Sequence, residues 1–302
     1  MEYKLNKREI EIKINSIDYP TIQDLFNTFI PSSKIQHLLI QNKWIKIDGK
    51  NVKREDPIEG DILSINIYPY DNEYDKSDYK IDVVYEDEFI IVVNKPKDIL
   101  VHSDGNNETT LTDYVKSYFF DKPYIDVTPI HRLDKETSGM IIFSKSKIFQ
   151  PLLDKLLEEK QIRRHYLAFS EGNFNKDSLT INEPIGKDRH NPNKRIIYKN
   201  GQEASTKLIK IANKNNVSII RCILETGRTH QIRVHLASIN LPILNDSLYG
   251  VKSNKIIRMG LIADELEFYH PIKEEMINLE IPLPNDLSKL YEEVIRWNMM
   301  QS

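Results

Sequence analysis

The sequence predicts an α+β protein in which a small N-terminal α/β unit precedes a larger domain built on a mixed, largely antiparallel sheet with flanking helices. Three observations support this class. Helical apolar spacing is confined to a few short segments, most other apolar runs are short and β-branched, and turn residues separate these runs. A polar, acidic stretch at 71–80 has the composition of a linker, so we expect the two parts at 1–70 and 81–302.

The composition bounds the class of protein further. A chain of 302 residues can bury a sizeable core without disulfides or a structural metal. Its single cysteine, Cys222, excludes an internal disulfide and a cysteine-rich zinc site. No apolar run approaches the roughly 20 residues of a membrane span, and the charged N-terminus does not resemble a secretory signal. We therefore expect a soluble, cytoplasmic, monomeric protein with no membrane partner.

The N-terminal unit is expected to contain two short helices between strands. Apolar and polar residues alternate over 8–16, which predicts a strand. Thr21 has the position of an N-cap for the first helix, and Ser33 that of a cap for the second. Segments 44–47 and 60–67 then read as strands joined through turns.

The larger domain is expected to begin with buried strands at 83–85 and 89–94, the second ended by Lys95-Pro96. A further buried strand is expected at 140–143. Four later segments have helical apolar spacing, at 111–119, 148–158, 229–238 and 285–297.

Charge is distributed unevenly along the chain, although the net charge is only −3. Residues 55–88 contain twelve Asp or Glu and two Lys, whereas residues 187–233 contain eleven Lys or Arg and three Asp or Glu. Such segregation can mark a basic face that binds an anionic partner. The alternative is a solvated loop plus an acidic linker, and charge alone slightly favours it.

The segment with most chemical information is a polar loop, His131-Arg132-Leu133-Asp134, which runs through Thr137-Ser138-Gly139 into an apolar strand. Glycine at the strand entrance permits tight backbone geometry, so the loop could hold Asp134 at a rigid edge as a reacting carboxylate. A lone Asp in a loop more often caps a turn, and here it could pair with Arg132. The residues alone favour that structural role.

A resemblance reverses this preference. His-Arg-Leu-Asp followed by Thr-Ser-Gly resembles the signature of the RluA-like family of RNA pseudouridine synthases. Similar stretches follow the family's pattern in order along the chain: 93–96 with 101–102, 164–168 through Gly172, Asp188, Arg195, 201–206, 225–237, 242–250 and 268–271. The resemblance implies the pseudouridine synthase fold and an isomerase that converts uridine in RNA to pseudouridine without cofactor or metal.

The helix–helix–turn–strand pattern of residues 18–68 resembles the S4-type RNA-binding domain, on Ser33-Lys34-Ile35, Ile47-Asp48-Gly49-Lys50 and Gly60-Asp61. An ordinary small α+β unit explains this stretch equally well. The resemblance implies phosphate contacts, which position an RNA rather than specify its sequence. The expected RNA-binding residues of the chain are Lys34, Lys43, Lys46, Lys50, Lys194 and Arg195.

The family resemblance implies three catalytic residues. It makes Asp134 the reacting carboxylate, Tyr166 the tyrosine beside the base and Arg233 the partner of Asp134. The carboxylate must be ionised, which requires a nearby cation. Whether it attacks the sugar or takes a proton from C2′ stays open.

The reaction also requires that the target uridine be flipped out of the stacked RNA, and unstacking it costs a few kcal/mol. The resemblance implies that Arg132 fills the space left by the flipped base and that Ile232 packs on the uracil. Core packing is the alternative role for Tyr166 and Ile232. The complete set of expected substrate-binding residues is Arg132, Ile232, His131, Lys95 and Arg228.

Three positions depart from the family pattern. Asp98 and Asn245 stand where glycine is common, and Ile262 stands where histidine is common. Asp tolerates left-handed backbone better than most residues, so we expect the turn at Asp98 to survive. None of these departures touches the expected chemistry, and we expect them to bear on local loop shape and on substrate choice.

The sequence argues against two other kinds of site. The His-Arg-Leu-Asp loop superficially matches a protein kinase, but the Gly-rich loop, the downstream Asn and Asp-Phe-Gly are missing. His230 and His235 are five residues apart, which does not place both on one helix face for a metal. The expected substrate is large-subunit ribosomal RNA, with transfer RNA second. A non-catalytic RNA-binding or ribosome assembly factor is the alternative from another class.

Overall fold

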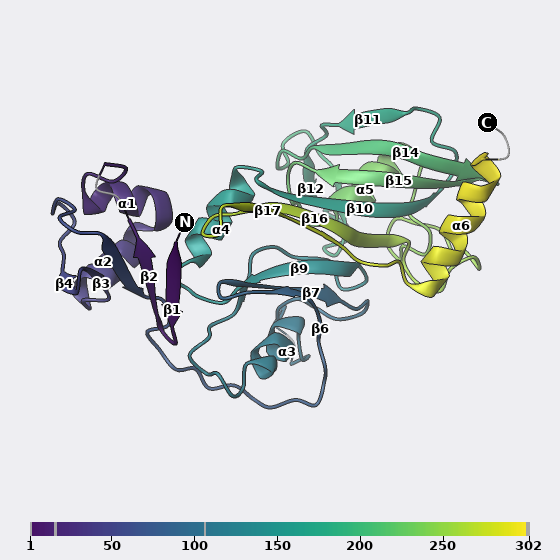
Figure 1. Cartoon of the computed structure of the whole chain (residues 1–302). Coiled ribbons are helices and arrows are strands. Elements are labelled where there is room, and N and C mark those ends of the chain that lie inside the picture. The colour runs from purple at the N-terminus through teal and green to yellow at the C-terminus, as the bar shows by residue number, and fades with distance from the viewer. Residues whose placement is uncertain (1, 15–16, 106, 300–302) are drawn as a thin grey trace.

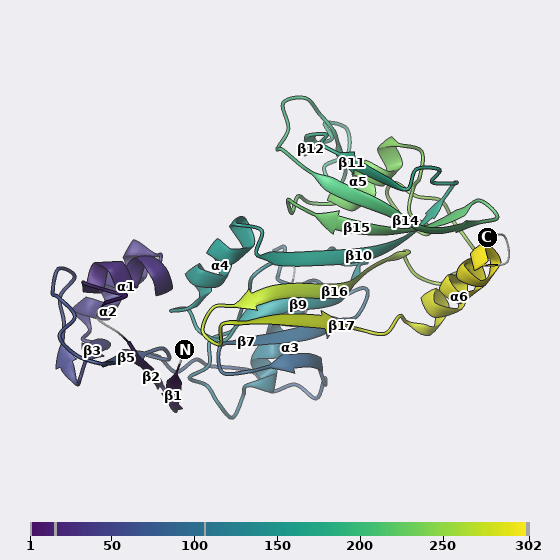
Figure 2. The same cartoon turned by 45° about the horizontal axis from the view of Figure 1, so that its top comes forward.

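The computed structural model describes residues 2–14, 17–105 and 107–299. The molecule is elongated, with the N-terminal strands and helices at one end and helix α6 (Asn285–Met299) at the other (Figure 1). A large sheet lies between them, and a second view keeps this order (Figure 2). Within the described ranges, no helix is long and apolar enough to cross a membrane.

The N-terminal end is a five-stranded antiparallel sheet, in the order β1-β2-β5-β3-β4, with two helices. The strand expected over 8–16 is confirmed in its middle, while residues 15 and 16 lie outside the described ranges. The elements of this N-terminal unit are β1 (Tyr3–Asn6), β2 (Glu9–Lys13), α1 (Ile22–Phe29), α2 (Ser33–Gln41), β3 (Ile45–Ile47), β4 (Lys50–Asn51) and β5 (Ile62–Asn66).

The first helix cap is confirmed and the second is wrong by one residue. Thr21 caps α1 in a reciprocal capping box with Asp24. In α2 the cap is Ser32, whose extended backbone lets its hydroxyl accept from the Ile35 N–H, whereas Ser33 is already helical.

The large sheet has ten strands and is mixed but mostly antiparallel, as predicted. Its main order is β11-β14-β15-β10-β16-β9-β7-β6, with β17 paired to β16 and β8 to β9. Strands β16 and β9 are parallel, and the remaining pairs are antiparallel. The strands are β6 (Asp82–Glu86), β7 (Ile90–Lys95), β8 (Thr128–Pro129), β9 (Ser138–Ser144), β10 (Ile162–Glu171), β11 (Ser178–Ile181), β14 (Thr206–Lys214), β15 (Val217–Leu224), β16 (Leu261–His270) and β17 (Glu275–Glu280).

Three further helices and a separate hairpin flank this sheet. They are α3 (Leu111–Tyr118), α4 (Gln150–Glu158), α5 (Gln231–Ser238), and β12 (Ile185–Lys187) paired with β13 (Arg195–Ile197). Helix α5 begins two residues later than predicted, because His230 has a left-handed backbone, with φ +59°. Helix α4 also begins two residues late, after Phe149 and with proline in its first turn. Helices α3 and α6 lie where the sequence predicts them.

The acidic segment 71–80 has no regular secondary structure, but it is held against the larger part of the chain. The Asn72 N–H donates to the carbonyl of Pro123 at 2.8 Å. The ring of Tyr79 stacks on that of Tyr114, with centroids 4.1 Å apart. The segment is therefore a packed strap rather than a free tether.

Candidate active site

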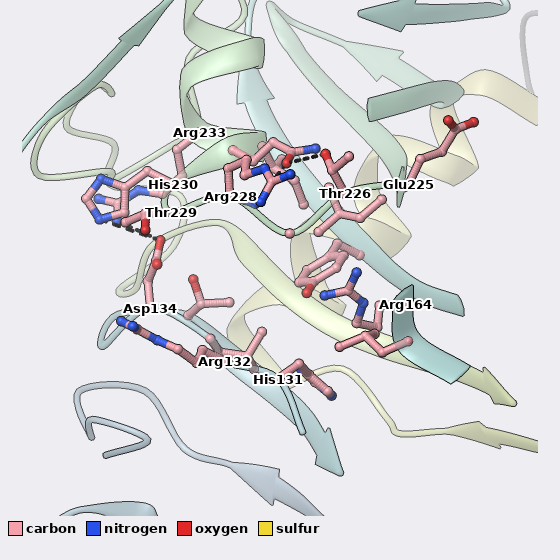
Figure 3. A pocket seen from close by; sticks show the side chains of 18 of the residues that line it. His131, Arg132, Asp134, Arg164, Glu225, Thr226, Arg228, Thr229, His230 and Arg233 are labelled. Carbon is pink, nitrogen blue, oxygen red and sulfur yellow. Dashed lines mark hydrogen bonds and ion pairs between the residues drawn. The ribbon is translucent and has the colours of Figure 1, made fainter. Parts of the chain in front are cut away.

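A pocket of about 580 Å³ lies between two loops that are far apart in the sequence. One loop carries residues 130–134 before β9, and the other carries residues 225–230 between β15 and α5. Figure 3 shows Asp134 and Arg132 on one side and His230 and Arg233 on the other. The volume is in the usual range of small-molecule sites.

A buried lysine, Lys95, supports the loop that carries Asp134 through hydrogen bonds to backbone carbonyls. The Lys95 ammonium donates to the carbonyls of Pro96, Ile99 and Lys135 at 2.8–2.9 Å, and the side chain is fully buried. Burial lowers the Lys95 pKa to about 8, while the Asp134 charge acts in the opposite direction. Lys95 does not line the pocket, and all three of its ammonium donors already have acceptors. The expected contact with the substrate is therefore corrected: Lys95 supports the loop that carries Asp134.

Backbone shape at this edge depends on left-handed residues. Gly139 has φ +121°, and a Cβ there would lie 2.2 Å from the Ala263 carbonyl oxygen, so only glycine fits where β9 runs beside β16. Asp98 has φ +66° and Asn245 has φ +57°. The expected survival of the Asp98 turn is confirmed, and its N–H donates to the Lys135 carbonyl at 2.8 Å.

Arg233 is a buried cation shared by three carboxylates. Its Nε and Nη2 donate to the two oxygens of Asp246 at 2.7 and 2.8 Å. Its Nη1 donates to Asp134 Oδ2 at 3.0 Å and its Nη2 to Glu136 at 2.9 Å. Burial opposes its charge, but the hydrogen bonds and charges of Asp246 and Asp134 raise the Arg233 pKa above its ordinary value. The guanidinium is therefore fixed and permanently charged.

Asp134 is held by one oxygen only. Both described partners, Arg233 Nη1 at 3.0 Å and His230 Nε2 at 3.9 Å, face Oδ2. Within the described ranges, Oδ1 accepts no hydrogen bond and no ion pair joins Asp134 to Arg132. The side chain is 24% exposed, whereas Arg233 is 2% exposed. The arrangement presents a charge-paired carboxylate with one oxygen available to a reacting group.

Two apolar-faced side chains complete the interior. Tyr166 on β10 and Ile232 on α5 both line the pocket and are each 4% exposed. Burial raises the Tyr166 pKa, so its phenol is neutral at neutral pH, while the Arg164 charge acts in the opposite direction. Arg164 also lines the pocket, and its buried Nε has no hydrogen-bond partner among the described residues. A flat ligand could pack here beside an unpaired cation.

The other expected substrate-binding residues differ in exposure. His131 is buried, and its Nε2 accepts from the Ile142 N–H at 3.3 Å. Burial, with the Arg164 charge, lowers the His131 pKa to about 3, so the ring is neutral. Arg132 and Arg228 are exposed at the pocket, and Arg228 Nε donates to the Glu203 carbonyl at 2.9 Å.

The expected RNA-binding residues fall in two places. Lys194 and Arg195 lie at the β12–β13 hairpin against Tyr249: the Lys194 ammonium is 5.7 Å from the ring centroid, and the Arg195 N–H donates to the hydroxyl at 2.6 Å. Lys43 and Lys46 line a groove of about 390 Å³ with Trp44 on the N-terminal sheet. Lys34 and Lys50 are exposed elsewhere on that unit.

The expectations drawn from the sequence omit Arg164, His230, Asp246, Tyr249 and Glu136 from the site. Each stands in a stretch that matches the family pattern, so sequence position offered a weak signal. Their roles depend on pairs far apart in the chain, such as Arg233 with Glu136, 97 residues away. Within the described ranges, no group of three or more His, Cys, Asp or Glu could hold a metal ion.

Comparison with known proteins identifies similar chains. A model of the RNA pseudouridylate synthase family matches residues 89–238. The chain is 36% identical to the uncharacterized RNA pseudouridine synthase YhcT of Bacillus subtilis over 90% of this chain and 87% of that one. It is 32% identical to the ribosomal large subunit pseudouridine synthase D of Escherichia coli K12, covering 86% and 85%. Human RNA pseudouridylate synthase domain containing 1 has 25% identity and a TM-score of 0.57, over 70% of this chain and 86% of that one.

Proposed function

The chain belongs to the RNA pseudouridine synthase family of isomerases, and on that premise we propose that it converts specific uridines of large-subunit ribosomal RNA to pseudouridine, with Asp134 as the reacting carboxylate. The observation that carries the proposal is the state of Asp134. Oδ2 is paired with the buried Arg233, and Oδ1 accepts no hydrogen bond from the described residues at the edge of the pocket.

The reaction detaches uracil from its ribose at N1 and reattaches it through C5. An ionised carboxylate is needed whether it attacks the sugar or removes a proton from C2′, and Arg233 favours that charge. Because Arg233 is fixed by Asp246, it can hold Asp134 without moving during the reaction. The free Oδ1 is the atom that would react in either mechanism.

The pocket interior suits a detached uracil. Tyr166 and Ile232 would pack against it, which keeps the free base beside the sugar while it rotates. The neutral Tyr166 phenol can hydrogen-bond to the base. Removal of the C5 proton by this oxygen would draw on the Arg164 charge, which favours the phenolate.

Access to the pocket requires a flipped nucleotide. Arg132 is exposed at its edge, where a guanidinium could stack in the space that the base leaves. Lys194 lies beside Tyr249, and we infer that it contacts phosphates of the same strand. The resemblance of the N-terminal unit to an S4 domain suggests a second RNA contact at Lys43 and Lys46.

The RNA target is proposed from the chain's similarity to proteins named for the large ribosomal subunit. Transfer RNA is the second candidate, because a pocket that takes a single nucleotide does not distinguish one class of RNA from another. Pseudouridine mapping in cells with and without the gene distinguishes the two: a site lost from large-subunit RNA supports the proposal, and a site lost only from transfer RNA replaces it.

The test of the catalytic assignment is Asp134→Asn in the purified protein. The near-isosteric change should lower the rate at the mapped uridine by about 10²–10⁴-fold, with RNA affinity largely kept. Asp177→Asn is the matched control, because that side chain is 98% exposed. Robust turnover by Asp134→Asn would overturn the assignment, and an inert wild type on cellular RNA would favour the non-catalytic factor.

A further inference from the structure

His230 is held in an unusual conformation beside the reacting carboxylate. It precedes helix α5 with φ +59° and ψ +19°, a left-handed backbone that is uncommon outside glycine, although histidine adopts it more often than most residues do. Its ring is 14% exposed, and its Nε2 is 3.9 Å from Asp134 Oδ2. Figure 3 shows the ring on the pocket side facing Asp134. Strain of this kind persists only where the surroundings over-determine it, and it concentrates at functional sites.

The side chain of Gln231 holds the turn that carries His230 in place through four hydrogen bonds. Its side-chain oxygen accepts from the Thr226 hydroxyl at 2.7 Å and from the Arg228 N–H at 3.0 Å. Its amide nitrogen donates to the Ser205 carbonyl and the Thr206 hydroxyl, both at 2.9 Å. All of the polar atoms of this buried amide are therefore engaged, and they fix the turn that carries His230.

The other ring nitrogen of His230 lies beside the hydroxyl of Tyr249, whose oxygen already accepts one hydrogen bond. The Arg195 backbone N–H donates to the Tyr249 hydroxyl oxygen at 2.6 Å. That oxygen is 2.9 Å from His230 Nδ1. Since an acceptor role is already taken by the Arg195 contact, the tyrosine proton is free to be donated to Nδ1. A neutral His230 then carries its own proton on Nε2, the nitrogen that faces Asp134.

The 3.9 Å separation is too long for a hydrogen bond, but it fits one oxygen placed about 2.7–3.0 Å from both atoms. A hydroxyl can accept from Nε2–H and donate to Asp134 Oδ2. A sugar bound for reaction at Asp134 offers such a group, because C1′ and C2′ must lie beside the carboxylate. The 2′-hydroxyl is also the group that distinguishes RNA from DNA.

We propose that His230 contacts the substrate by donating from Nε2 to the ribose 2′-hydroxyl of the target nucleotide, in a tautomer set by Tyr249. This role deepens the proposed function and rests on it. Tyr249 acts as a positioning residue, since it works through His230. The contact makes His230 a determinant of ribose over deoxyribose at the target position.

The first experiment needs no RNA. The ring nitrogens are followed by NMR in full-length protein with ¹⁵N-labelled histidine, and the His230 signals are identified by their loss in His230→Asn. The expected result is an unprotonated Nδ1 and a protonated Nε2 in the wild type, with both tautomers populated in Tyr249→Phe. Protonation at Nδ1 in the wild type would overturn the proposal.

The second experiment is a double-mutant cycle that combines one substitution in the protein with one change in the RNA and measures binding. The probes are a synthetic stem–loop carrying the mapped uridine and the same RNA with 2′-deoxyuridine at that position. Wild type should bind the deoxy RNA about tenfold more weakly, and His230→Asn should lose most of that difference. Asparagine tolerates the left-handed backbone but does not reach the Nε2 position, whereas His230→Gln places an amide donor near it and should restore part of the discrimination.

An equal deoxy penalty in wild type and His230→Asn would overturn the contact. Failure of the proposed function has a different signature: turnover by Asp134→Asn with the tautomer and the binding cycle unchanged. Thermal unfolding of each variant, together with the binding of the unmodified stem–loop, separates the loss of one contact from the loss of the fold.

Discussion

Asp134 and Asp87 are both carboxylates held by cations, yet their oxygens are used differently. Asp87 Oδ1 accepts from the N–H groups of Phe89 and Ile90 at 2.8 and 2.9 Å. Its Oδ2 is bound by the Tyr85 hydroxyl at 2.7 Å, His270 Nε2 at 3.0 Å and Lys273 Nζ at 3.3 Å. Asp134, in contrast, has its partners on Oδ2 alone.

The difference separates a structural carboxylate from the one that we propose to be reactive. Asp87 is 3% exposed and has every lone-pair direction occupied, so it fixes the turn that leads into β7. The neighbouring Glu88 carbonyl accepts from the Tyr68 hydroxyl, which ties the N-terminal unit to that turn. Asp134 leaves one oxygen open in a pocket, where an unsatisfied group can meet a substrate.

The largest effect is expected from Arg233→Leu, which removes the cation from the open carboxylate. Asp246 and Asp134 would remain without their partner, at a cost of roughly 3–5 kcal/mol. Asp134 would lose the positive charge that favours its ionised form, so the rate should fall strongly, and Arg233→Lys should recover only part because an ammonium lacks the planar fork. Single-turnover rates of the wild type and both variants on bound RNA test this. Near-normal rates in Arg233→Leu would show that Arg233 is not the partner that matters.

Asp87→Asn tests the closed carboxylate and should act on stability alone. Hydrogen bonds to a charged group contribute about 1.5–3 kcal/mol each, so we expect a loss of at least about 2 kcal/mol in unfolding free energy at pH 7. Burial opposes ionisation, but bonds from His270 and Tyr85 and the charge of His270 hold the Asp87 pKa below its ordinary value of 3.8.

A carboxyl group with a lowered folded-state pKa stabilises the fold above its unfolded pKa, and this contribution is lost on acidification. The stability gap between wild type and Asp87→Asn should therefore be full at pH 7 and shrink as the pH falls below about 4. Urea unfolding at several pH values measures the gap. An intact rate on RNA is expected, and a large rate loss in a folded Asp87→Asn protein would contradict the division between the two carboxylates.

The smallest effect is expected at Lys194, which contacts neither Asp134 nor Asp87. RNA affinity should fall steeply with salt despite the net charge of −3. Lys194→Gln should weaken binding a few-fold and reduce the slope of log affinity against log salt by about 0.7–0.9, the value for one phosphate contact. Lys289→Gln on α6 is the matched control, because its side chain is exposed and no residue of α6 lines the pocket. Equal slopes for the two variants would remove Lys194 from the RNA surface.

Local patterns predicted the elements well and their ends less well. The cap at Thr21 and the three strands predicted at 83–85, 89–94 and 140–143 agree with the structure within a few residues. The cap of α2 and the start of α5 depend on the backbone conformation of single residues, Ser32 and His230, which side-chain type does not specify. The strap at 71–80 has a linker's composition, yet its tyrosines found partners that its own sequence could not reveal.

The sequence by itself determined the fold class, the family and the loop that presents Asp134, because these depend on alternation, turn residues and contiguous motifs. Tertiary structure alone decided which oxygen of Asp134 is free, that Lys95 supports the loop, and that Arg233 serves three carboxylates. The physical reason is distance along the chain. Asp134 and Arg233 are 99 residues apart, and the geometry of such a pair exists only after the sheet brings two loops together.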